Sequence, residues 1–229
     1  PGPVLVDVPR DVQLSSCEFD SWPDIASVTI HDIRFHTPPS EYASSMDRIT
    51  DALAEARRPV LFCGGGCNSE AAAKELQKFL KSYRLPVVTS LMGIGCVPSS
   101  FEMFAGMVGM HGSYAANMAL SESDLIICLG ARFDDRVTGK LSEFGKNAKI
   151  IHVDIDPSSI SKIINADYPI VGDVKSVLEE MLPRIKSEVS PQNFEQWREL
   201  IRKYDEIHPL KFNDSDEILK PQWIIQSTA

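Results

Sequence analysis

Two arginines spaced four residues apart, Arg132 and Arg136, have the clearest capacity for ligand chemistry in this sequence. They alternate with two acids in the segment Gly-Ala-Arg-Phe-Asp-Asp-Arg-Val-Thr-Gly, residues 130–139. The planar guanidinium group of arginine binds phosphate oxygens, and its permanent charge is costly to bury without a partner. The segment therefore indicates either a phosphate-binding loop or a network of Arg–Asp ion pairs on the surface.

A triple glycine, residues 64–66, follows the apolar run at residues 60–63. Glycine lets backbone amides approach a phosphate or ribose closely, and the start of a following helix favours an anion. The segment lacks the G-x-G-x-x-G spacing of dinucleotide-binding loops. A tight turn from strand to helix is therefore the alternative reading of these glycines.

Two further segments carry candidate ligand contacts. Ser90, Leu91 and Met92 offer a hydroxyl group and flexible apolar surface that suit a flat ring system, or they belong to the core. The segment Gly-Met-His-Gly-Ser, residues 109–113, precedes a predicted helix of small residues. Its single histidine, His111, is more often a hydrogen-bonded structural residue than a catalytic one.

Acidic residues follow two other apolar runs. Asp154 and Asp156 end one run, and Asp173 follows the glycine that ends the next. A carboxylate at a strand end can accept hydrogen bonds from ribose hydroxyls, whereas its other common role is to cap a helix. We expect Asp156 to cap a short helix that begins at Pro157.

Five apolar runs must position these loops. They are residues 60–63, 86–89, 124–130, 149–154 and 170–171. The longer runs are continuous and do not alternate with polar residues, which is typical of strands covered on both faces. Glycine turns and helical periodicity follow them, so the sequence predicts a parallel α/β sheet wrapped in helices. Ligands of such sheets bind beyond the carboxyl ends of the strands, and the loops there indicate a nucleotide or flavin dinucleotide without choosing between NAD, FAD and a nucleoside diphosphate.

Composition excludes several classes of protein. The chain has 229 residues, of which 43% are hydrophobic and 24% charged, with a net charge of −9. This acidity makes nucleic acid and anionic membranes poor general partners. Five scattered cysteines do not form a disulfide framework, and no Cys-x₂-Cys pair indicates a zinc or other metal site. We expect Cys63 and Cys128 to be buried.

Four segments divide the chain. We expect residues 1–13 to form one apolar strand, 14–40 a linker, 41–187 the central cofactor-binding domain, and 188–229 a connector in which a further domain begins. The sequence opens without Met and ends in what reads as the first turn of a helix, so we expect a fragment of a longer protein.

Three segments, residues 109–112, 130–139 and 152–157, closely resemble the central domain of the acetolactate synthase (acetohydroxyacid synthase) large-subunit family. Residues 1–9 resemble the end of that family's N-terminal, pyrimidine-binding domain. The resemblance implies a six-stranded, parallel, Rossmann-like sheet with helices on both faces. It also implies a thiamine diphosphate-dependent transferase that decarboxylates pyruvate and joins the two-carbon unit to a second 2-oxo acid, in branched-chain amino-acid synthesis.

The same resemblance implies that this domain binds FAD, while other domains bind thiamine diphosphate and Mg²⁺. The cofactor-binding residues that it implies are Gly65, Ser90, Leu91, Met92, Gly109, Met110, His111, Gly112, Gly130, Arg132, Asp134, Arg136, Val137, Asp154, Ile155, Asp173 and Val174. The family's catalytic glutamate and its Gly-Asp-Gly metal-binding segment have no counterpart here, so we expect no catalytic residue and no synthase activity in this chain alone.

The resemblance further implies a parent that forms homo-oligomers, with a regulatory small subunit in some members, whereas this chain alone would be a monomer. A bacterial cytoplasm is the expected location, or a plastid or mitochondrion in a eukaryote. The alternatives are another thiamine diphosphate carboligase, a flavin oxidase, and a non-catalytic nucleotide-binding module.

Overall fold

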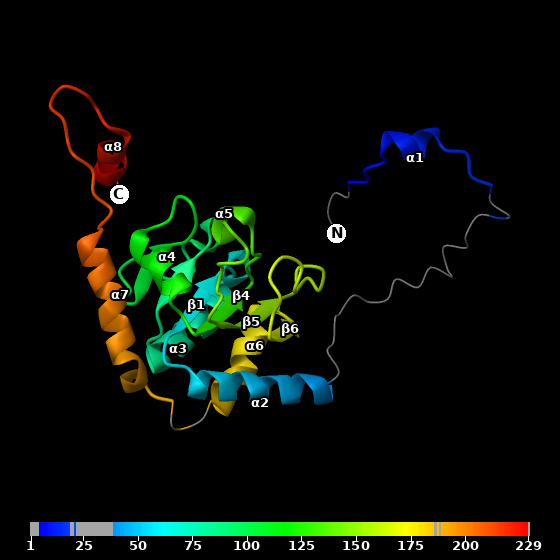
Figure 1. Cartoon of the computed structure of the whole chain (residues 1–229), viewed down its shortest axis with the longest axis horizontal. Helices are drawn as coiled ribbons and strands as arrows, with labels where there is room; N and C mark the ends of the chain where they lie inside the picture. The colour runs from blue at the N-terminus through cyan, green and yellow to red at the C-terminus, as the bar shows by residue number, and fades with distance from the viewer. Residues whose placement is uncertain (1–4, 19–20, 22–38, 186, 188, 229) are drawn as a thin grey trace. The chain divides into compact units, whose positions relative to one another are not determined.

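A six-stranded, all-parallel β-sheet forms the core of the larger part of the chain, between Pro59 and Val171 (Figure 1). The computed structural model describes residues 5–18, 21, 39–185, 187 and 189–228. The strands are β1 (Pro59–Cys63), β2 (Val87–Thr89), β3 (Phe104–Met107), β4 (Leu125–Leu129), β5 (Lys149–Asp154) and β6 (Tyr168–Val171). The predicted α/β fold with a six-stranded parallel sheet is confirmed.

The strand order is β3-β2-β1-β4-β5-β6, so the chain moves outward in one direction from β1 and then in the other from β4. In register, Phe62 lies beside Cys128 and Cys128 beside His152. The connection after β1 therefore leads toward the β3 edge of the sheet, and the connection after β4 leads toward the β6 edge. In open α/β sheets this reversal of strand order opens a crevice for ligands.

Helices cover both faces of the sheet, because alternate side chains of each buried strand point to opposite faces. Leu61 and Cys63 of β1 belong to one cluster of buried residues, whereas Val60 and Phe62 belong to another. The helices α2 (Pro39–Glu55), α3 (Glu70–Tyr83) and α6 (Val174–Met181) pack on the first cluster. The burial predicted for Cys63 and Cys128 is confirmed.

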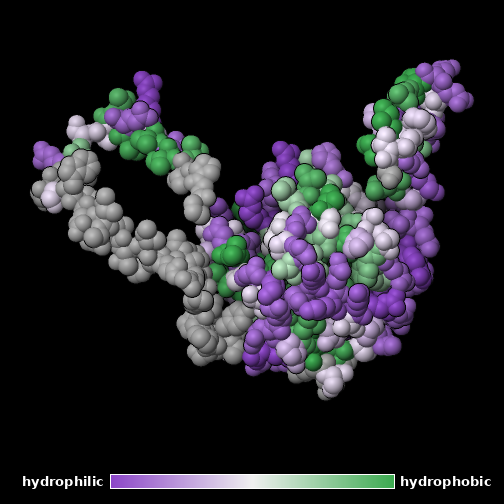
Figure 2. Space-filling model, turned by 180° about the vertical axis from the view of Figure 1, so that it is seen from behind, coloured by the Kyte–Doolittle hydropathy of each residue, from purple (hydrophilic) through white to green (hydrophobic). Residues whose placement is uncertain are grey.

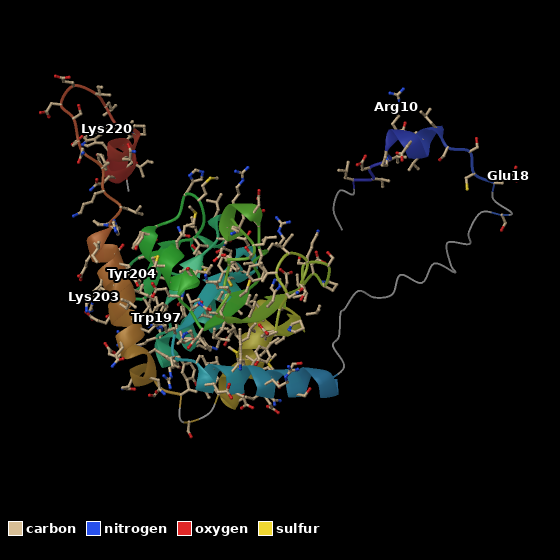
Figure 3. All side chains as sticks on the ribbon, viewed as in Figure 1. Arg10, Glu18, Trp197, Lys203, Tyr204 and Lys220 are labelled. Carbon is tan, nitrogen blue, oxygen red and sulfur yellow. The ribbon has the colours of Figure 1, made fainter. Side chains whose placement is uncertain are left out.

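The second face is covered by α4 (Tyr114–Ser121) and α7 (Glu195–Ile207). Trp197 and Tyr204 lie on the side of α7 that faces the sheet, while Lys203 lies on the opposite side (Figure 3). The indole Nε1 of Trp197 donates a hydrogen bond of 3.0 Å to the Pro59 carbonyl, and the Tyr204 hydroxyl donates to Glu122. Helix α7 is thus joined to the start of β1 and the end of α4.

Short polar side chains begin three of these helices. The Ser69 hydroxyl accepts a hydrogen bond from the Ala72 amide at the start of α3. Ser113 and Asp173 cap α4 and α6 in the same way. Each cap satisfies an amide that has no partner inside the helix.

The remaining elements are short. They are α1 (Arg10–Leu14), α5 (Asp135–Thr138), α8 (Pro221–Thr228) and single 3₁₀ turns η1 (Gly65–Cys67), η2 (Leu91–Gly93), η3 (Leu182–Arg184) and η4 (Pro191–Phe194). The chain divides into two units, residues 1–34 and 35–229, and within the first the side chains of α1 are exposed. Hydrophilic residues cover much of the face of the second unit seen in Figure 2, with hydrophobic residues in smaller groups. No described helix is both long enough and apolar enough to cross a membrane.

Two predicted elements are wrong. The strand expected within residues 1–13 does not form over residues 5–9. These residues are exposed, and their backbone pairs with no described strand. Residues 1–4 lie outside the described residues. The helix expected after Pro157 is a series of turns over residues 157–161. Of the expected linker, residues 19–20 and 22–38 also lie outside the described residues.

Candidate functional site

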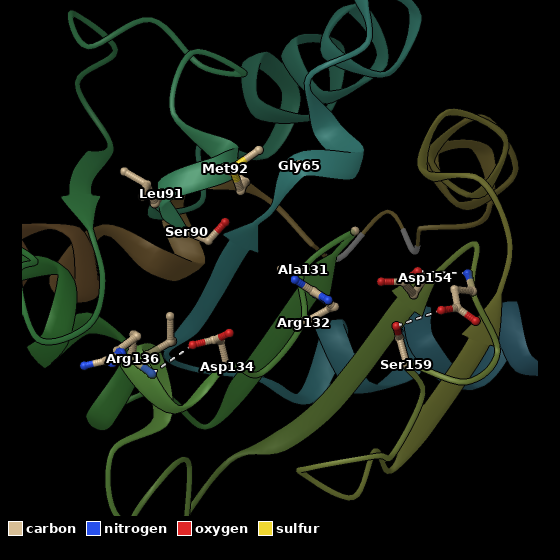
Figure 4. A pocket seen from close by; sticks show the side chains of 13 residues that line it. Gly65, Ser90, Leu91, Met92, Ala131, Arg132, Asp134, Arg136, Asp154 and Ser159 are labelled. Carbon is tan, nitrogen blue, oxygen red and sulfur yellow. Dashed lines mark hydrogen bonds between the residues drawn. The ribbon is translucent and has the colours of Figure 1, made fainter. Parts of the chain in front are cut away.

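A cavity of about 520 Å³ lies beyond the carboxyl ends of β1, β2, β4 and β5, where the strand order reverses (Figure 4). This volume is within the roughly 300–1,000 Å³ range of small-molecule pockets. Its lining residues are Gly65, Ser90, Leu91, Met92, Gly130, Ala131, Arg132, Asp134, Arg136, Val137, Asp154, Asp156 and Ser159.

The triple glycine after β1 contributes to this cavity in two different ways. A side chain on Gly64 would place its Cβ 2.2 Å from the Gly130 carbonyl oxygen, and one on Gly66 would lie 2.8 Å from the Gly130 Cα. These two glycines therefore let the β1 and β4 turns pack backbone to backbone. Gly65 has room for a Cβ, which would lie 3.4 Å from the nearest atom, in Met92. Packing explains Gly64 and Gly66, and at Gly65 the missing side chain leaves space in the cavity.

The turn after β4 places two arginines at the cavity. Gly130 has a φ of +56°, a conformation that favours glycine, and the chain then exposes Arg132 between two buried neighbours. Arg136 lies in α5, whose first residues are held by Asp134. Figure 4 shows Arg132 in the middle of the cavity and Arg136 toward one end.

The charges of these arginines are satisfied to different degrees. The Arg136 guanidinium lies 3.9 Å from Asp135, and both side chains are exposed. Among the described residues, Arg132 forms no salt bridge. A hydrogen bond from the Arg136 amide, together with the nearby positive charges, lowers the pKa of Asp134. The Arg–Asp surface network considered from the sequence therefore describes Arg136 only, because Arg132 remains available for an anion.

The turn after β2 supplies an apolar wall. Leu91 and Met92 are each 70% exposed, so the turn presents two large apolar side chains at the cavity. The turn is held by a hydrogen bond of 3.0 Å from the Ser90 amide to the Cys63 carbonyl. In Figure 4, Ser90 and Leu91 lie on the opposite side of the cavity from Asp134 and Arg136.

Carboxylates form the other end of the cavity, at the turn after β5. Asp154 is 8% exposed and accepts a hydrogen bond of 2.9 Å from the Asp156 amide. Asp156 in turn accepts hydrogen bonds from the amide and hydroxyl of Ser158 and from the hydroxyl of Ser159. The bonds from Ser158 lower the pKa of Asp156. Both carboxylates thus hold the turn together and also face the cavity.

Ten of the residues implied by the family resemblance lie together in the cavity lining. They are Gly65, Ser90, Leu91, Met92, Gly130, Arg132, Asp134, Arg136, Val137 and Asp154. These residues come from four separate loops, so the parallel sheet brings together positions up to 89 residues apart (154 − 65).

The other seven predicted site residues, Gly109, Met110, His111, Gly112, Ile155, Asp173 and Val174, do not line the cavity. Two are close to it, since the Met110 amide donates to the Arg136 carbonyl and Gly109 packs on the same group. His111 and Ile155 are exposed outside the lining, and Gly112 packs on the backbone of β3. Asp173 caps α6, and Val174 is buried beneath Gly66.

Three lining residues, Ala131, Asp156 and Ser159, are not among those predicted. Asp156 carries a signal in the sequence, a carboxylate just beyond a strand end, but its place before Pro157 favours a helix cap. Ser159 falls in the helix predicted after Pro157, and this segment is in fact a turn. Ala131 has no distinguishing chemistry, and only its place between Gly130 and Arg132 marks it.

Comparison with known proteins places the chain in a family. Residues 46–181 match the family described as thiamine pyrophosphate enzyme, central domain. The chain is 41% identical to the acetolactate synthase large subunit of Buchnera aphidicola subsp. Schizaphis graminum and 37% identical to the acetolactate synthase isozyme 3 large subunit of Escherichia coli, in each case over 99% of its length. It is 41% identical to the acetolactate synthase of Mycobacterium leprae. The chain spans only 36–40% of the length of these relatives.

Proposed function

The chain belongs to the thiamine pyrophosphate enzyme family and contains its central domain, and we propose that it is the cofactor-holding middle part of an acetolactate synthase large subunit. The observation that carries this proposal is the match over 99% of the chain to proteins of that name. The proposed reaction of the whole protein is decarboxylation of pyruvate followed by transfer of the two-carbon unit to a second 2-oxo acid, with thiamine diphosphate and Mg²⁺ bound by other domains.

We propose FAD as the ligand of the cavity. Three features of the lining fit this dinucleotide: an arginine without a salt bridge to the described residues, a glycine whose side-chain space is open, and a wall of exposed apolar side chains. Arg132 and Gly65 would hold the diphosphate, because guanidinium groups and glycine amides both suit phosphate oxygens. When bound, the flavin acts as a structural group and is not consumed in the main reaction.

The two ends of the cavity would hold the two ends of FAD. Leu91 and Met92 offer the apolar surface that a flavin ring requires, and Arg136 lies across the cavity from Leu91. Asp154 and Asp156 would accept hydrogen bonds from the ribose or adenine at the other end. For the whole protein we propose a cytoplasmic homo-oligomer, and for this chain the domain limits 41–187.

The first test is equilibrium binding of FAD to the 229-residue chain, measured by the quenching of flavin fluorescence. We expect saturable binding that is tighter than the binding of NAD or ADP, since only FAD fills both the apolar and the acidic end. If ADP or NAD binds with equal or higher affinity, the proposed ligand of the cavity is a smaller nucleotide and not FAD. Absence of binding by all three would refute a nucleotide site.

The second test concerns the reaction. We expect no acetolactate from pyruvate, thiamine diphosphate and Mg²⁺ with this chain alone. A chimera in which it replaces the matched segment of the Escherichia coli isozyme 3 large subunit is expected to form acetolactate. A folded chimera that retains FAD and thiamine diphosphate but forms no acetolactate would argue for another carboligase of the family.

A further inference from the structure

His152 is a buried histidine of β5 with an unusual set of contacts. It is fully buried, and its Nε2 lies 3.0 Å from the Ala131 carbonyl oxygen. Cys128, its neighbour in register on β4, donates from its Sγ to the same oxygen over 3.2 Å. Two side chains from adjacent strands thus hold one carbonyl in the turn after β4.

The contacts define the protonation of the ring. Because a carbonyl oxygen only accepts, Nε2 must carry the hydrogen, and Nδ1 then has a free lone pair. Nδ1 is buried and has no hydrogen-bond partner among the described residues. Burial lowers the pKa of His152, and the ionisable groups facing it are Cys128 and Asp154. The imidazole is therefore neutral near pH 7.

An unpartnered buried nitrogen is a cost that an apolar residue of similar size would avoid. The position itself does not require histidine, because Ile150 on the same strand and Cys128 beside it on β4 belong to a hydrophobic cluster of buried residues. The hydrogen bond to Ala131 is the contact that an apolar residue could not make. This points to a role for His152 in the turn rather than in the core.

His152 contacts both neighbours of Arg132. Ala131, before it, is held by the hydrogen bond, and the ring of Phe133, after it, packs on the imidazole with centroids 4.9 Å apart and planes at 70°. Ala131 and Phe133 are each 3% exposed, whereas Arg132 between them is exposed. The turn is thus anchored on both sides of the arginine by one side chain.

We propose that His152 is a positioning residue that fixes the backbone on either side of Arg132 so that the guanidinium group is held in the cavity toward an anionic ligand. This inference rests on the proposed function, in which that ligand is the diphosphate of FAD. His152 does not touch the cavity itself, because it is absent from the lining and fully buried. Its effect on the ligand is therefore transmitted through Arg132.

A double-mutant cycle on FAD affinity tests this role in the 229-residue chain. His152→Phe removes the donor but keeps an aromatic ring, and we expect the dissociation constant to rise about tenfold, as for loss of one well-placed hydrogen bond. In a chain that already carries Arg132→Ala, the same substitution is expected to change affinity less than about twofold, because the group it positions is gone. His152→Gln, which restores an N–H donor, should recover most of the affinity.

The matched control is Ile150→Val, on the same strand, buried, and outside the cavity lining. It removes packing and is expected to lower the melting temperature while leaving FAD affinity unchanged. If His152→Phe does not fold, Phe133→Leu enters the cycle in its place, because it removes the anchor on the far side of Arg132 and keeps the hydrogen bond.

The outcomes separate the two proposals. Equal losses of affinity with and without Arg132 would show that His152 is merely structural and would overturn the inference while FAD binding stands. Unchanged affinity in His152→Phe would do the same. If the unsubstituted chain binds no FAD, the proposed function fails and this positioning role fails with it.

Discussion

The turn after β4, residues 130–134, and the turn after β5, residues 154–159, both line the cavity, but they satisfy their charges in opposite ways. In the β5 turn, Asp156 accepts three hydrogen bonds from the two serines that follow it. In the β4 turn, Cys128 and His152 hydrogen-bond to the backbone carbonyl of Ala131, whereas Arg132 has no salt bridge to any described residue. The acidic turn holds itself together, and the cationic turn presents an unpaired charge.

From this difference we infer which charged side chains contribute most to binding a ligand. A charge already bound to its own turn explains local structure first, and its effect on a ligand is small. A charged residue with a fixed backbone and an unpaired side chain needs little rearrangement when a ligand binds. Such a residue is therefore expected to contribute most to affinity. The comparison therefore predicts a decreasing effect of substitution from Arg132 to the carboxylates.

Arg132→Ala should give the largest loss of FAD affinity. A charge-assisted contact contributes about 1.5–3 kcal/mol, which corresponds to a rise in the dissociation constant of roughly 10- to 150-fold. The control is Arg57→Ala, since Arg57 is exposed beyond the end of α2 and outside the cavity lining. Equal FAD affinities in the two variants, measured by flavin fluorescence, would contradict a special role of the β4 turn in binding the ligand.

Gly65→Ala should follow, with a loss of about tenfold in FAD affinity and little change in melting temperature, because the added Cβ enters the cavity and meets no protein atom closer than 3.4 Å. Gly64→Ala is the matched control. Its Cβ would lie 2.2 Å from the Gly130 oxygen, so about 1–3 kcal/mol of overpacking should lower the melting temperature by several degrees. The reverse pattern in calorimetry and binding would contradict the different roles of these glycines.

Asp154→Asn should weaken FAD binding only about two- to fivefold, since the amide oxygen still accepts a hydrogen bond and only the charge is lost. Asp173→Asn is the control, because Asp173 caps α6 and lies outside the cavity lining. A loss at Asp154 as large as that at Arg132 would show that the acidic turn recognises the ligand as strongly as the cationic turn does.

The smallest effect concerns pH and the anchor of the cationic turn. Burial lowers the pKa of His152 in the folded protein, so the unfolded chain binds a proton more readily below the ordinary histidine pKa of ~6.5. The free energy of unfolding of the unsubstituted chain should therefore fall more steeply than that of His152→Gln as the pH drops from 7 toward 5. Parallel curves from urea unfolding would contradict a neutral buried imidazole. The lowered carboxylate pKa values of Asp134 and Asp156 act only in a more acidic range.

Much of the sheet is predictable from short-range pattern. Strands β4 and β5 are continuous apolar runs because both of their faces are buried, and this pattern is visible in the sequence. Strand β3 is an edge strand with half-buried residues and an irregular pairing with β2, so no such run marks it. Only the family resemblance, which implied six strands, accounted for it.

The failed predictions have local causes. Residues 5–8 have the composition of a strand, but a strand needs a partner and none pairs with them among the described residues. The segment after Asp156 begins like a capped helix, yet Asp156 bonds the nearest serine groups and the chain continues in turns. In both cases the local sequence is typical of the predicted element. The missing strand partner in the first case and the Asp156–serine hydrogen bonds in the second decide the conformation.

The amino-acid order by itself determines the buried strands β1, β2, β4 and β5, the turns that carry glycine, and the charges that end up beyond the strand ends. Only the folded arrangement decides that Arg132 forms no salt bridge with any described residue, that Gly65 has free space while Gly64 has none, and that His152 holds the carbonyl beside Arg132. These outcomes depend on contacts between residues from about 20 to 65 positions apart, such as His152 with Ala131 and Gly64 with Gly130. Such contacts follow from strand order and register, which no local pattern of residues encodes.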